Sequence, residues 1–303
     1  MQQNKKHLII LGGPTASGKT KLAIAIAQAL GTEVLNADSR QFYQQMRIGT
    51  AVPTEEELAS APHHFIQSHD AAHPLSAADY ETQALKLTKK LFKKHDILVV
   101  CGGSGLYLQA LASGLDPLPP ADPAYRLELE EIFKKEGVDA LAAIMKRKDS
   151  EKAASMDLKN PRRLIRALEI MHAGPIPEVL KKKEPREFEV IPIFLNVDRE
   201  TLYARIDRRV EEMIEAGLLE EVKSLLPLRD SAALQTVGYR ELFDHIDGLY
   251  SLEEAIEKIK QHTRNYAKRQ LTWFRNKGNY QEVQDFDSAM EVIQQHLTLA
   301  SGH

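Results

Sequence analysis

The fold is decided by one stretch near the N-terminus, HLIILGGPTASGKT at residues 7–20. Its opening, HLIIL at residues 7–11, is a short apolar run typical of a buried strand, whereas residues 19–30 repeat apolar side chains at helical spacing. Between them, residues 13–20 match the pattern G-x-x-x-x-G-K-[ST]. Glycine lets several backbone N–H groups converge, and a helix N-terminus adds partial positive charge. The stretch therefore predicts a phosphate-binding loop between a strand and a helix.

The residues of this loop have expected roles. Lys19 neutralises the outermost phosphate, and the hydroxyl of Thr20 is offered to Mg²⁺. The residues that we expect to bind the phosphates are Gly13, Pro14, Thr15, Ala16, Ser17, Gly18, Lys19 and Thr20. The alternative is a glycine turn that matches the pattern by chance. Even a true phosphate loop indicates what is held and not which reaction follows.

Apolar runs at residues 34–37 and 97–101 predict two further strands. An amphipathic helix from about residue 77 to residue 94 lies between them, with Ser76 as its N-cap. Short apolar strands that alternate with helices are typical of a parallel sheet covered on both faces. We therefore predict an α/β fold.

The metal site of a standard ATPase is incomplete in this sequence. Such enzymes carry an Asp after a neighbouring strand to orient Mg²⁺, but residues 101–105 (CGGSG) contain no carboxylate. Asp38, at the end of the second strand, is the remaining candidate. Because the carboxyl ends of parallel strands meet at one edge of a sheet, we expect Asp38 to face the phosphate loop. Its alternative role is a helix N-cap.

The middle of the chain predicts a helical insertion. Four prolines within residues 117–123 mark a domain junction. Residues from about 124 to 183 look helical, residues 185–192 close this segment, and strand character resumes at residues 193–197.

We therefore divide the chain into a core, residues 1–116 with 189–303, and a helical insertion, residues 117–188. A length of 303 residues agrees with about two domains. Within the core, residues 199–276 look helical and end in a long helix from about residue 252.

Composition excludes several classes of protein. With 43% hydrophobic and 27% charged residues, the chain is neither disordered nor a disulfide scaffold. Its one cysteine, Cys101, excludes an internal disulfide and a cysteine-based zinc site. No apolar run approaches the roughly 20 residues of a membrane span, and no signal peptide is visible. We expect a cytoplasmic protein without a membrane segment.

Positive charge gathers locally although the net charge is −3. Residues 258–277 hold seven Lys or Arg and no Asp or Glu, with three aromatic residues between them. On a helix, Lys260, Arg264 and Lys268 form a row that is typical of phosphate contacts, while interleaved aromatic rings are typical of stacking on unpaired bases. The alternative is a solvated helix face.

The predicted insertion is balanced in charge, with fifteen Lys or Arg against fourteen Asp or Glu over residues 121–190. Its positive charges nevertheless cluster at residues 146–148, 162–166 and 181–183. Asn160 and Pro161 are typical of the start of a helix, which would bring the arginines of the second cluster close to that helix end.

Nine short motifs run through the chain: GPTASGKT (13–20), DSRQFY (38–43), IGTA (48–51), PHHFI (62–66), SAADY (76–80), GGSGLY (102–107), NPRRLIRALE (160–169), VGYRE (237–241) and KRQLTWFR (268–275). Together they resemble the tRNA dimethylallyltransferase family, also called tRNA isopentenyltransferases. Only the phosphate loop is shared widely outside that family, so the resemblance is specific and covers nearly the whole chain.

The resemblance implies a P-loop NTPase-like core and a reaction. Members of the family transfer a dimethylallyl group from dimethylallyl diphosphate to N6 of the adenine immediately 3′ of the anticodon, position 37 of tRNA. The phosphate loop would then hold, with Mg²⁺, the diphosphate that leaves. The implied partner is the tRNA anticodon stem-loop, and we expect a monomer.

The resemblance also implies roles for single residues. Asp38 resembles the general base, with Lys19, Thr20 and Arg209 as the other catalytic residues. Arg209 and Arg205, which lie four apart on one helix face, are expected on the diphosphate; the alternative is a basic face paired with nearby acidic residues. The residues expected to bind tRNA are Asp38, Ser39, Arg40, Gln41, Ser104, Arg126, Arg162, Arg163, Arg166, Gln235, Gly238, Tyr239, Arg240, Lys268, Arg269, Trp273 and Arg275. For Ser104, helix capping is as good an explanation.

Some residues depart from the family pattern. Arg47 stands where Asp is usual, Val52 where Lys is usual, and Gln67 where an acidic residue is usual. Four histidines within residues 63–73 suggest a metal site, but no cysteine assists them and two of them are adjacent, which weakens that hypothesis.

Three other functions remain as alternatives. An adenylate isopentenyltransferase would prenylate a free nucleotide, which leaves residues 258–277 without a purpose. A small-molecule kinase would need a cleft for the adenine of ATP and an acceptor pocket. A non-catalytic RNA-binding module is disfavoured because Asp38 accompanies an intact phosphate loop.

Overall fold

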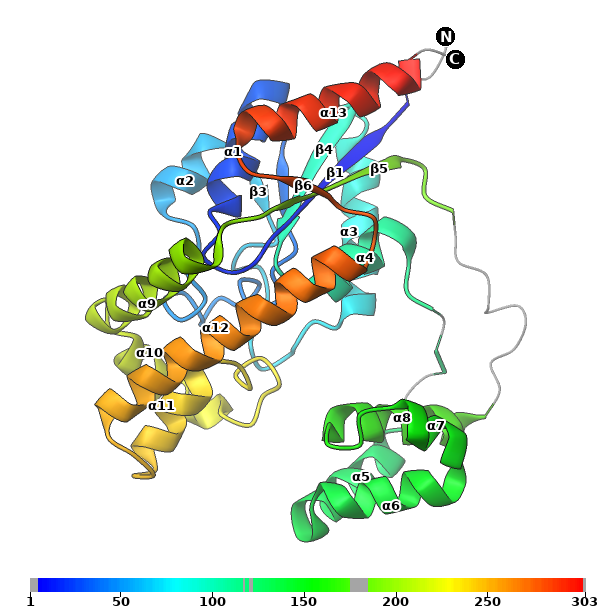
Figure 1. The fold of residues 1–303 in the computed structure, drawn as a ribbon, viewed down its shortest axis with the longest axis vertical. Helices are drawn as coiled ribbons and strands as arrows, with labels where there is room; N and C mark the ends of the chain where they lie inside the picture. Colours follow the sequence, from blue (N-terminus) through cyan, green and yellow to red (C-terminus); the bar gives the residue numbers. More distant parts are fainter. Residues whose placement is uncertain (1–4, 117, 120–121, 175–184, 302–303) are drawn as a thin grey trace. The chain divides into compact units, whose positions relative to one another are not determined.

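A parallel sheet of six strands forms the centre of the molecule's larger unit (Figure 1). The computed structural model describes residues 5–116, 118–119, 122–174 and 185–301. In chain order the strands are β1 (His7–Gly12), β2 (Val34–Asn36), β3 (His63–His64), β4 (Ile97–Gly102), β5 (Glu189–Leu195) and β6 (Gln281–Val283). Their spatial order is β3-β2-β4-β1-β5-β6. The strand in front of the phosphate loop, β1, is therefore paired on both sides, and the predicted α/β fold is confirmed.

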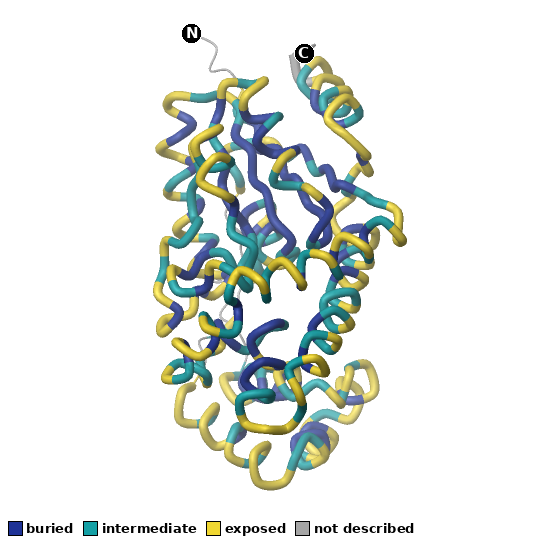
Figure 2. Tube along the Cα trace, turned by 90° about the vertical axis from the view of Figure 1, so that its left-hand side faces the viewer, coloured by how far each residue is buried: buried dark blue, intermediate teal, exposed yellow. Residues whose placement is uncertain are grey.

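Alternate residues of β1 enter two different hydrophobic layers. Ile9 and Leu11 pack on the side of α1 (Lys19–Leu30) and α13 (Phe286–Ser301). Leu8 and Ile10 belong to the layer on the other side, where the helices include α3 (Ala77–Leu91), α4 (Gly105–Ser113) and α12 (Leu252–Asn276). All six residues of β1 are buried, and Figure 2 shows dark blue strands in the centre of the larger unit. A strand that is covered on both faces has to be apolar throughout, which is why HLIIL shows no alternation.

Several predicted helix boundaries agree with the structure. Helix α1 begins at Lys19 and ends at Leu30. Helix α3 begins after Ser76, whose hydroxyl accepts the N–H of Asp79 in a capping box, but it ends at Leu91 and not at residue 94. The long helix α12 starts at Leu252 as expected. The other elements of this unit are α2 (Glu55–Ser60), α9 (Arg199–Glu215), α10 (Leu218–Ser224), the 3₁₀ helix η2 (Leu226–Leu228) and α11 (Tyr239–Ile246).

The expected start of β5 was wrong. We predicted that residues 185–192 close the preceding segment, yet β5 begins at Glu189 and contains Pro192. Pro192 pairs with Ile10 of β1, whereas β6 pairs only with residues 193–195. One side of the backbone at Pro192 therefore has no strand to bond with, so the missing N–H of proline is tolerated there.

The chain divides into two compact units, residues 1–114 with 185–303 and residues 115–184. The second unit consists of α5 (Pro123–Glu136), α6 (Val138–Lys148), α7 (Ser150–Ser155) and α8 (Pro161–Ala173). It has a hydrophobic cluster of its own that includes Leu129, Leu141, Met145, Leu164 and Leu168. The helical character expected over residues 175–183, and the basic cluster at residues 181–183, lie outside the described residues. None of the helices in the described ranges is long and apolar enough to cross a membrane.

Candidate active site

The phosphate loop joins β1 to α1 through a backbone that is curled at two positions. Ala16 and Gly18 have φ angles of 62° and 92°, in the left-handed region that an alanine rarely adopts. The N–H of Ser17 donates to the carbonyl of Pro14. The hydroxyl oxygen of Ser17 is buried and has no hydrogen-bond partner among the described residues. A strained loop with an unsatisfied polar atom is what a site for an anion requires before its ligand arrives.

A cleft of about 960 Å³ opens beside this loop. It is lined by Ala16, Ser17, Gly18, Lys21, Asn196, Val197, Asp198, Thr201, Arg205, Arg208, Arg209, Glu212 and Gln284. Four of the lining residues are Lys or Arg and two are Asp or Glu. The cleft therefore combines the loop with an excess of positive charge, which suits a diphosphate.

Lys19 and Arg205 hydrogen-bond to the loop, and Arg209 lines the cleft beside it. The Nζ of Lys19 donates to the carbonyl of Pro14 at 3.3 Å, and Arg205 Nη1 donates to the carbonyl of Ser17 at 3.2 Å. Burial lowers the pKa of Lys19, an effect that Asp38 and Cys101 oppose. A phosphate anion bound beside Lys19 would stabilise its protonated, charged form.

Arg209 is not part of a solvated basic face. Burial lowers the pKa of its guanidinium, while Glu212 and Asp38 oppose that shift. Among the described residues Asp207 binds Arg264 at 2.5 Å and Glu212 binds Arg208 at 3.4 Å, while Glu212 also acts electrostatically on Arg209. Binding of the diphosphate by Arg205 and Arg209 stays a prediction.

Asp38 lies in a smaller pocket of about 170 Å³. Residues 39–42 form turns, and Oδ1 of Asp38 accepts the N–H of Arg40 at 3.1 Å, so the helix-cap alternative is wrong. The pocket is lined by Thr15, Asp38, Ser39, Arg40, Gly49, Thr50, Ala51, Ile206, Arg209, Val210, Met213, Thr236, Val237, Gly238, Ile259, Thr263 and Tyr266. Arg209 lines both this pocket and the cleft beside the phosphate loop. Arg209 therefore belongs to the wall of both cavities.

Ser104 is the N-cap residue of α4, but its side chain contacts the Asp38 loop and makes no capping hydrogen bond. Its Oγ accepts the N–H of Ser39 at 2.9 Å and donates to Ser39 Oγ at 3.0 Å, instead of bonding to the described backbone of α4. Tyr266 also hydrogen-bonds to Ser104, and burial together with Asp38 raises the pKa of Tyr266 to about 12. The close approach depends on Gly102, where an added Cβ would lie 2.4 Å from the carbonyl carbon of Ala37.

Gln270 connects the phosphate loop to the loop after β4. Its Oε1 accepts the N–H of Thr15 at 2.9 Å, and its Nε2 donates to the carbonyl of Gly103 at 2.9 Å. The side chain is 5% exposed. We did not identify Gln270 or Tyr266 as site residues from the sequence. Both lie in the basic stretch of α12, where the mixture of aromatic and amide residues among lysines and arginines was the available signal.

Several residues expected to bind tRNA are used inside the protein. Arg40 donates to the carbonyls of residues 232 and 233, and Gln41 donates to the carbonyls of residues 50 and 51. Tyr239 is fully buried, and its hydroxyl donates to Glu221 at 2.7 Å. Arg40 lines the Asp38 pocket, and all three side chains are held by contacts within the protein. Contact of these residues with RNA stays a prediction.

The other residues of the 235–240 segment are divided between two cavities. Gln235 donates to the carbonyl of Arg229 at 2.8 Å. Gln235 and Arg240 line a separate cavity of about 390 Å³. Gly238, with a φ of 95°, lines the Asp38 pocket.

The expected row of cations on α12 is largely neutralised. Lys260 binds Glu211 and Glu257, each at 2.9 Å, and Arg264 binds Asp207. Their partners on α9 are about fifty residues away in sequence, so no local pattern indicated them.

The C-terminal half of α12 keeps exposed positive charge. Lys268, Arg269 and Arg275 are exposed, and the guanidinium of Arg269 lies over the ring of Tyr266. Trp273 is half-buried and makes an edge contact with Phe274, so its stacking on a base stays a prediction.

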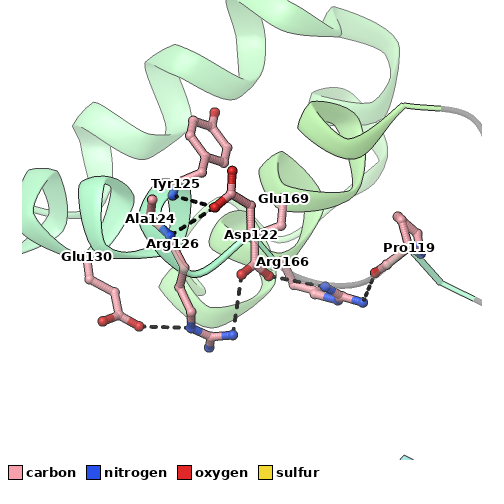
Figure 3. Close-up of polar contacts among 8 residues, drawn as sticks. All are labelled: Pro119, Asp122, Ala124, Tyr125, Arg126, Glu130, Arg166 and Glu169. Atoms are coloured by element: carbon pink, nitrogen blue, oxygen red, sulfur yellow. Dashed lines mark hydrogen bonds and ion pairs between the residues drawn. The ribbon is translucent and has the colours of Figure 1, made fainter.

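In the second unit, Arg126 and Arg166 both bind the buried carboxylate of Glu169 (Figure 3). The side chain of Glu169 is 1% exposed and lies 3.4 Å from Arg126 and 3.3 Å from Arg166. Arg166 also donates to the carbonyl of Pro119. Arg126 and Arg166, which we expected on tRNA, thus stabilise the unit itself. Arg162 and Arg163 are exposed at the start of α8, where Asn160 Oδ1 caps the helix.

The site can accommodate Mg²⁺ with few protein ligands. Within the described ranges, no three His, Cys, Asp or Glu side chains are grouped so as to hold a metal ion. Two of the histidines proposed for a metal have other partners, since His64 binds Glu33 at 2.7 Å and His63 contacts the carbonyl of Ala61. Mg²⁺ commonly retains several waters and uses substrate phosphates as ligands. Thr20, at the second position of α1, fits that mode of binding.

Comparison with known proteins agrees with this geometry. The sequence profile of the IPP transferase family matches residues 41–277. The tRNA dimethylallyltransferases of Cytophaga hutchinsonii and Christiangramia forsetii are 47% and 48% identical over 272 residues, which are 89% of this chain and 90% of each relative. The solved full-length tRNA isopentenylpyrophosphate transferase of Bacillus halodurans has a TM-score of 0.70 and 39% identity, and the match covers 98% of this chain and 96% of that chain. The corresponding enzyme of Staphylococcus epidermidis also has a TM-score of 0.70, with 32% identity, and the match covers 98% of this chain and 100% of that chain.

Proposed function

The chain belongs to the IPP transferase family, and from that premise we propose that it transfers a dimethylallyl group from dimethylallyl diphosphate to N6 of the adenine at position 37 of tRNA. It is a prenyltransferase that acts on tRNA, like its relatives. One observation carries the proposal: Arg209 lines both the phosphate-loop cleft and the pocket of Asp38. A donor that spans the two cavities would present its reactive carbon to the carboxylate.

The diphosphate is the leaving group and occupies the cleft. Negative charge grows on the bridging oxygen as the C–O bond breaks, so fixed cations stabilise the transition state more than the bound substrate. Lys19, Arg205 and Arg209 supply those cations, and the buried hydroxyl of Ser17 supplies a donor. When it is bound, Mg²⁺ supplies further charge neutralisation, with Thr20 as its protein ligand.

The five-carbon group occupies the Asp38 pocket beside apolar side chains. Ile206, Val210 and Ile259 line this pocket. They exclude water from the allylic carbon, which protects it from hydrolysis while positive charge develops there. The reaction therefore proceeds between an apolar wall and a carboxylate.

Asp38 accepts the proton that the amine releases. The lone pair of N6 is delocalised into the purine ring, so attack requires a base that removes a proton as the C–N bond forms. Ser39 and Ser104, tied together and to Tyr266, fix the loop that carries Asp38. The adenine has to leave its stack to reach this depth, as bases do in other enzymes that modify them. We infer that the anticodon stem-loop is the bound RNA and that the enzyme acts as a cytoplasmic monomer.

An assay with labelled dimethylallyl diphosphate, Mg²⁺ and either tRNA or AMP tests the proposal. Label should enter tRNA at the adenine next to the anticodon, with release of diphosphate. Transfer to AMP but not to tRNA would support an adenylate isopentenyltransferase instead. Turnover of ATP without prenyl transfer would support a kinase.

A further inference from the structure

A surface groove adjoins the Asp38 pocket through shared side chains. The groove has a volume of about 670 Å³, against about 170 Å³ for the pocket. Three residues line both cavities: Ala51, Arg209 and Met213. The apolar lining of the groove continues through Ile48, Val52 and Pro53. The two cavities therefore share a wall that is three residues wide.

The size of the pocket matches a short donor. In another protein, an apolar cavity of about 150 Å³ binds benzene, which has six carbons. A pocket of about 170 Å³ accordingly accommodates a five-carbon dimethylallyl group. A ten-carbon geranyl group requires additional space. The adjoining groove would provide that space if the shared wall were opened.

Met213 is the member of this wall that can block the passage. Ala51 contributes a single methyl group, and Arg209 also lines the phosphate-loop cleft, where the proposed function uses it to bind the diphosphate. Met213 follows Arg209 by four residues on α9, so the two side chains lie on the same helix face. Its side chain is long, apolar and partly buried against the hydrophobic core. A methionine fills irregular space with a thioether that adapts to its neighbours.

We propose that Met213 determines the length of the isoprenoid diphosphate that the enzyme accepts, by closing the Asp38 pocket on the side of the groove. This inference rests on the proposed function. With a shorter residue at position 213, geranyl diphosphate keeps its diphosphate on the phosphate loop and its second isoprene unit enters the groove beside Val52. The N6–C1 bond forms, the C1–O bond breaks, diphosphate leaves and the proton goes to Asp38, as for the shorter donor.

The test compares two donors in three full-length proteins. Dimethylallyl and geranyl diphosphate are each supplied with tRNA to the wild type, Met213→Ala and the matched control Met290→Ala. Met290 is partly buried in a different hydrophobic cluster and lines neither cavity. Met213→Ala should raise the ratio of kcat/KM for geranyl over dimethylallyl diphosphate by about 10- to 100-fold, the range typical of a change of this size in a hydrophobic pocket. The ratio for Met290→Ala should equal that of the wild type.

A second substitution tests the path into the groove. Val52→Lys in the Met213→Ala background places a charge beside the added isoprene unit, so the gain with geranyl diphosphate should disappear while dimethylallyl transfer persists. If Met213→Ala folds poorly, Met213→Val is used, with a smaller expected gain. An unchanged donor ratio in a folded Met213 variant would overturn the inference, as would equal use of both donors by the wild type. Transfer of neither donor by the wild type is a different result, because it would overturn the proposed function itself.

Discussion

At the scale of single residues, the reaction depends on the carboxylate of Asp38. Replacing it by Asn keeps an oxygen that accepts the N–H of Arg40 but removes the base, so Asp38→Asn should lower kcat by about 10²-fold or more. Binding of tRNA should stay near the wild-type value in a filter-binding assay. Asp70→Asn is a matched control, because Asp70 also accepts an N–H two residues ahead but lines neither cavity. Full activity of the Asp38 variant would show that another group takes the proton.

Lys19 gives the pH dependence of donor binding. Burial lowers its pKa below the ordinary value of 10.5, so the ammonium loses its charge at a lower pH than an exposed lysine does. kcat/KM for dimethylallyl diphosphate should therefore fall as the pH rises, before pH 10.5 is reached. Lys19→Arg keeps its charge over this range and should move the decline to higher pH. A profile of rate against pH for both proteins checks this, and superimposable alkaline limbs would contradict it.

The sequence indicated residues whose role depends on their own motif. The phosphate loop and Asp38 were identified because each follows the end of a strand, and Arg209 because the family resemblance implies an arginine of this helix on the diphosphate. Tyr266, Gln270 and Met213 were missed as members of the site. Each acquires its role from a contact with a distant segment, as when Gln270 binds Thr15, 255 residues away. Pattern and spacing do not report such contacts.

At the scale of elements, α12 is connected to the phosphate loop through Gln270. Gln270→Leu leaves the partly buried N–H of Thr15 and the buried carbonyl of Gly103 without this partner, which should lower the free energy of unfolding by about 1–3 kcal/mol. The looser phosphate loop should also bind inorganic pyrophosphate more weakly at a temperature where the variant is folded. Gln261→Leu, on the exposed surface of the same helix, should change neither property. Calorimetric titration with pyrophosphate and thermal melts measure the two effects, and lower stability without weaker binding would assign Gln270 a purely structural role.

The two halves of α12 should respond differently to removal of charge. Lys268→Ala and Arg269→Ala remove exposed cations, so each should make tRNA binding less dependent on salt. The slope of log K against log salt should change by about 0.7–0.9 for each RNA phosphate that is no longer neutralised. Arg264→Ala should leave that slope unchanged, because Arg264 is paired with Asp207. Its removal should cost at most about 1 kcal/mol of stability. Equal slopes for all three variants would remove this helix from the RNA interface.

Elements with a strong periodic pattern were predicted well, and short ones were not. The boundaries of α1 and the start of α12 follow from caps and apolar spacing. Strand β3 has two residues and β6 has three, too few for any period to show. The start of β5 was misjudged because the tolerance of Pro192 depends on where its neighbour β6 begins.

At the scale of the whole molecule, both cavities of the candidate site lie in one of the two units. Every residue that lines the cleft and the Asp38 pocket belongs to the unit of residues 1–114 and 185–303. Replacing residues 115–184 by a flexible Gly/Ser linker should therefore preserve the sheet and the binding of pyrophosphate. Affinity for tRNA should fall by about tenfold or more, because the exposed arginines of α8 are removed. Circular dichroism, calorimetry and filter binding measure these properties, and undiminished tRNA affinity would place the RNA entirely on the larger unit.

The position of β1 between β4 and β5 has a consequence for synthesis on the ribosome. β4 ends at Gly102, but β5, the other neighbour of β1, ends only at Leu195. At about 5–20 residues per second, the fully buried strand β1 of the nascent chain waits roughly 5–20 seconds with one edge bare. An unpaired strand edge invites pairing with other chains. The intervening helices, which have a hydrophobic cluster of their own, can fold during that interval, so the chain's exposure to aggregation is greatest just before β5 leaves the exit tunnel.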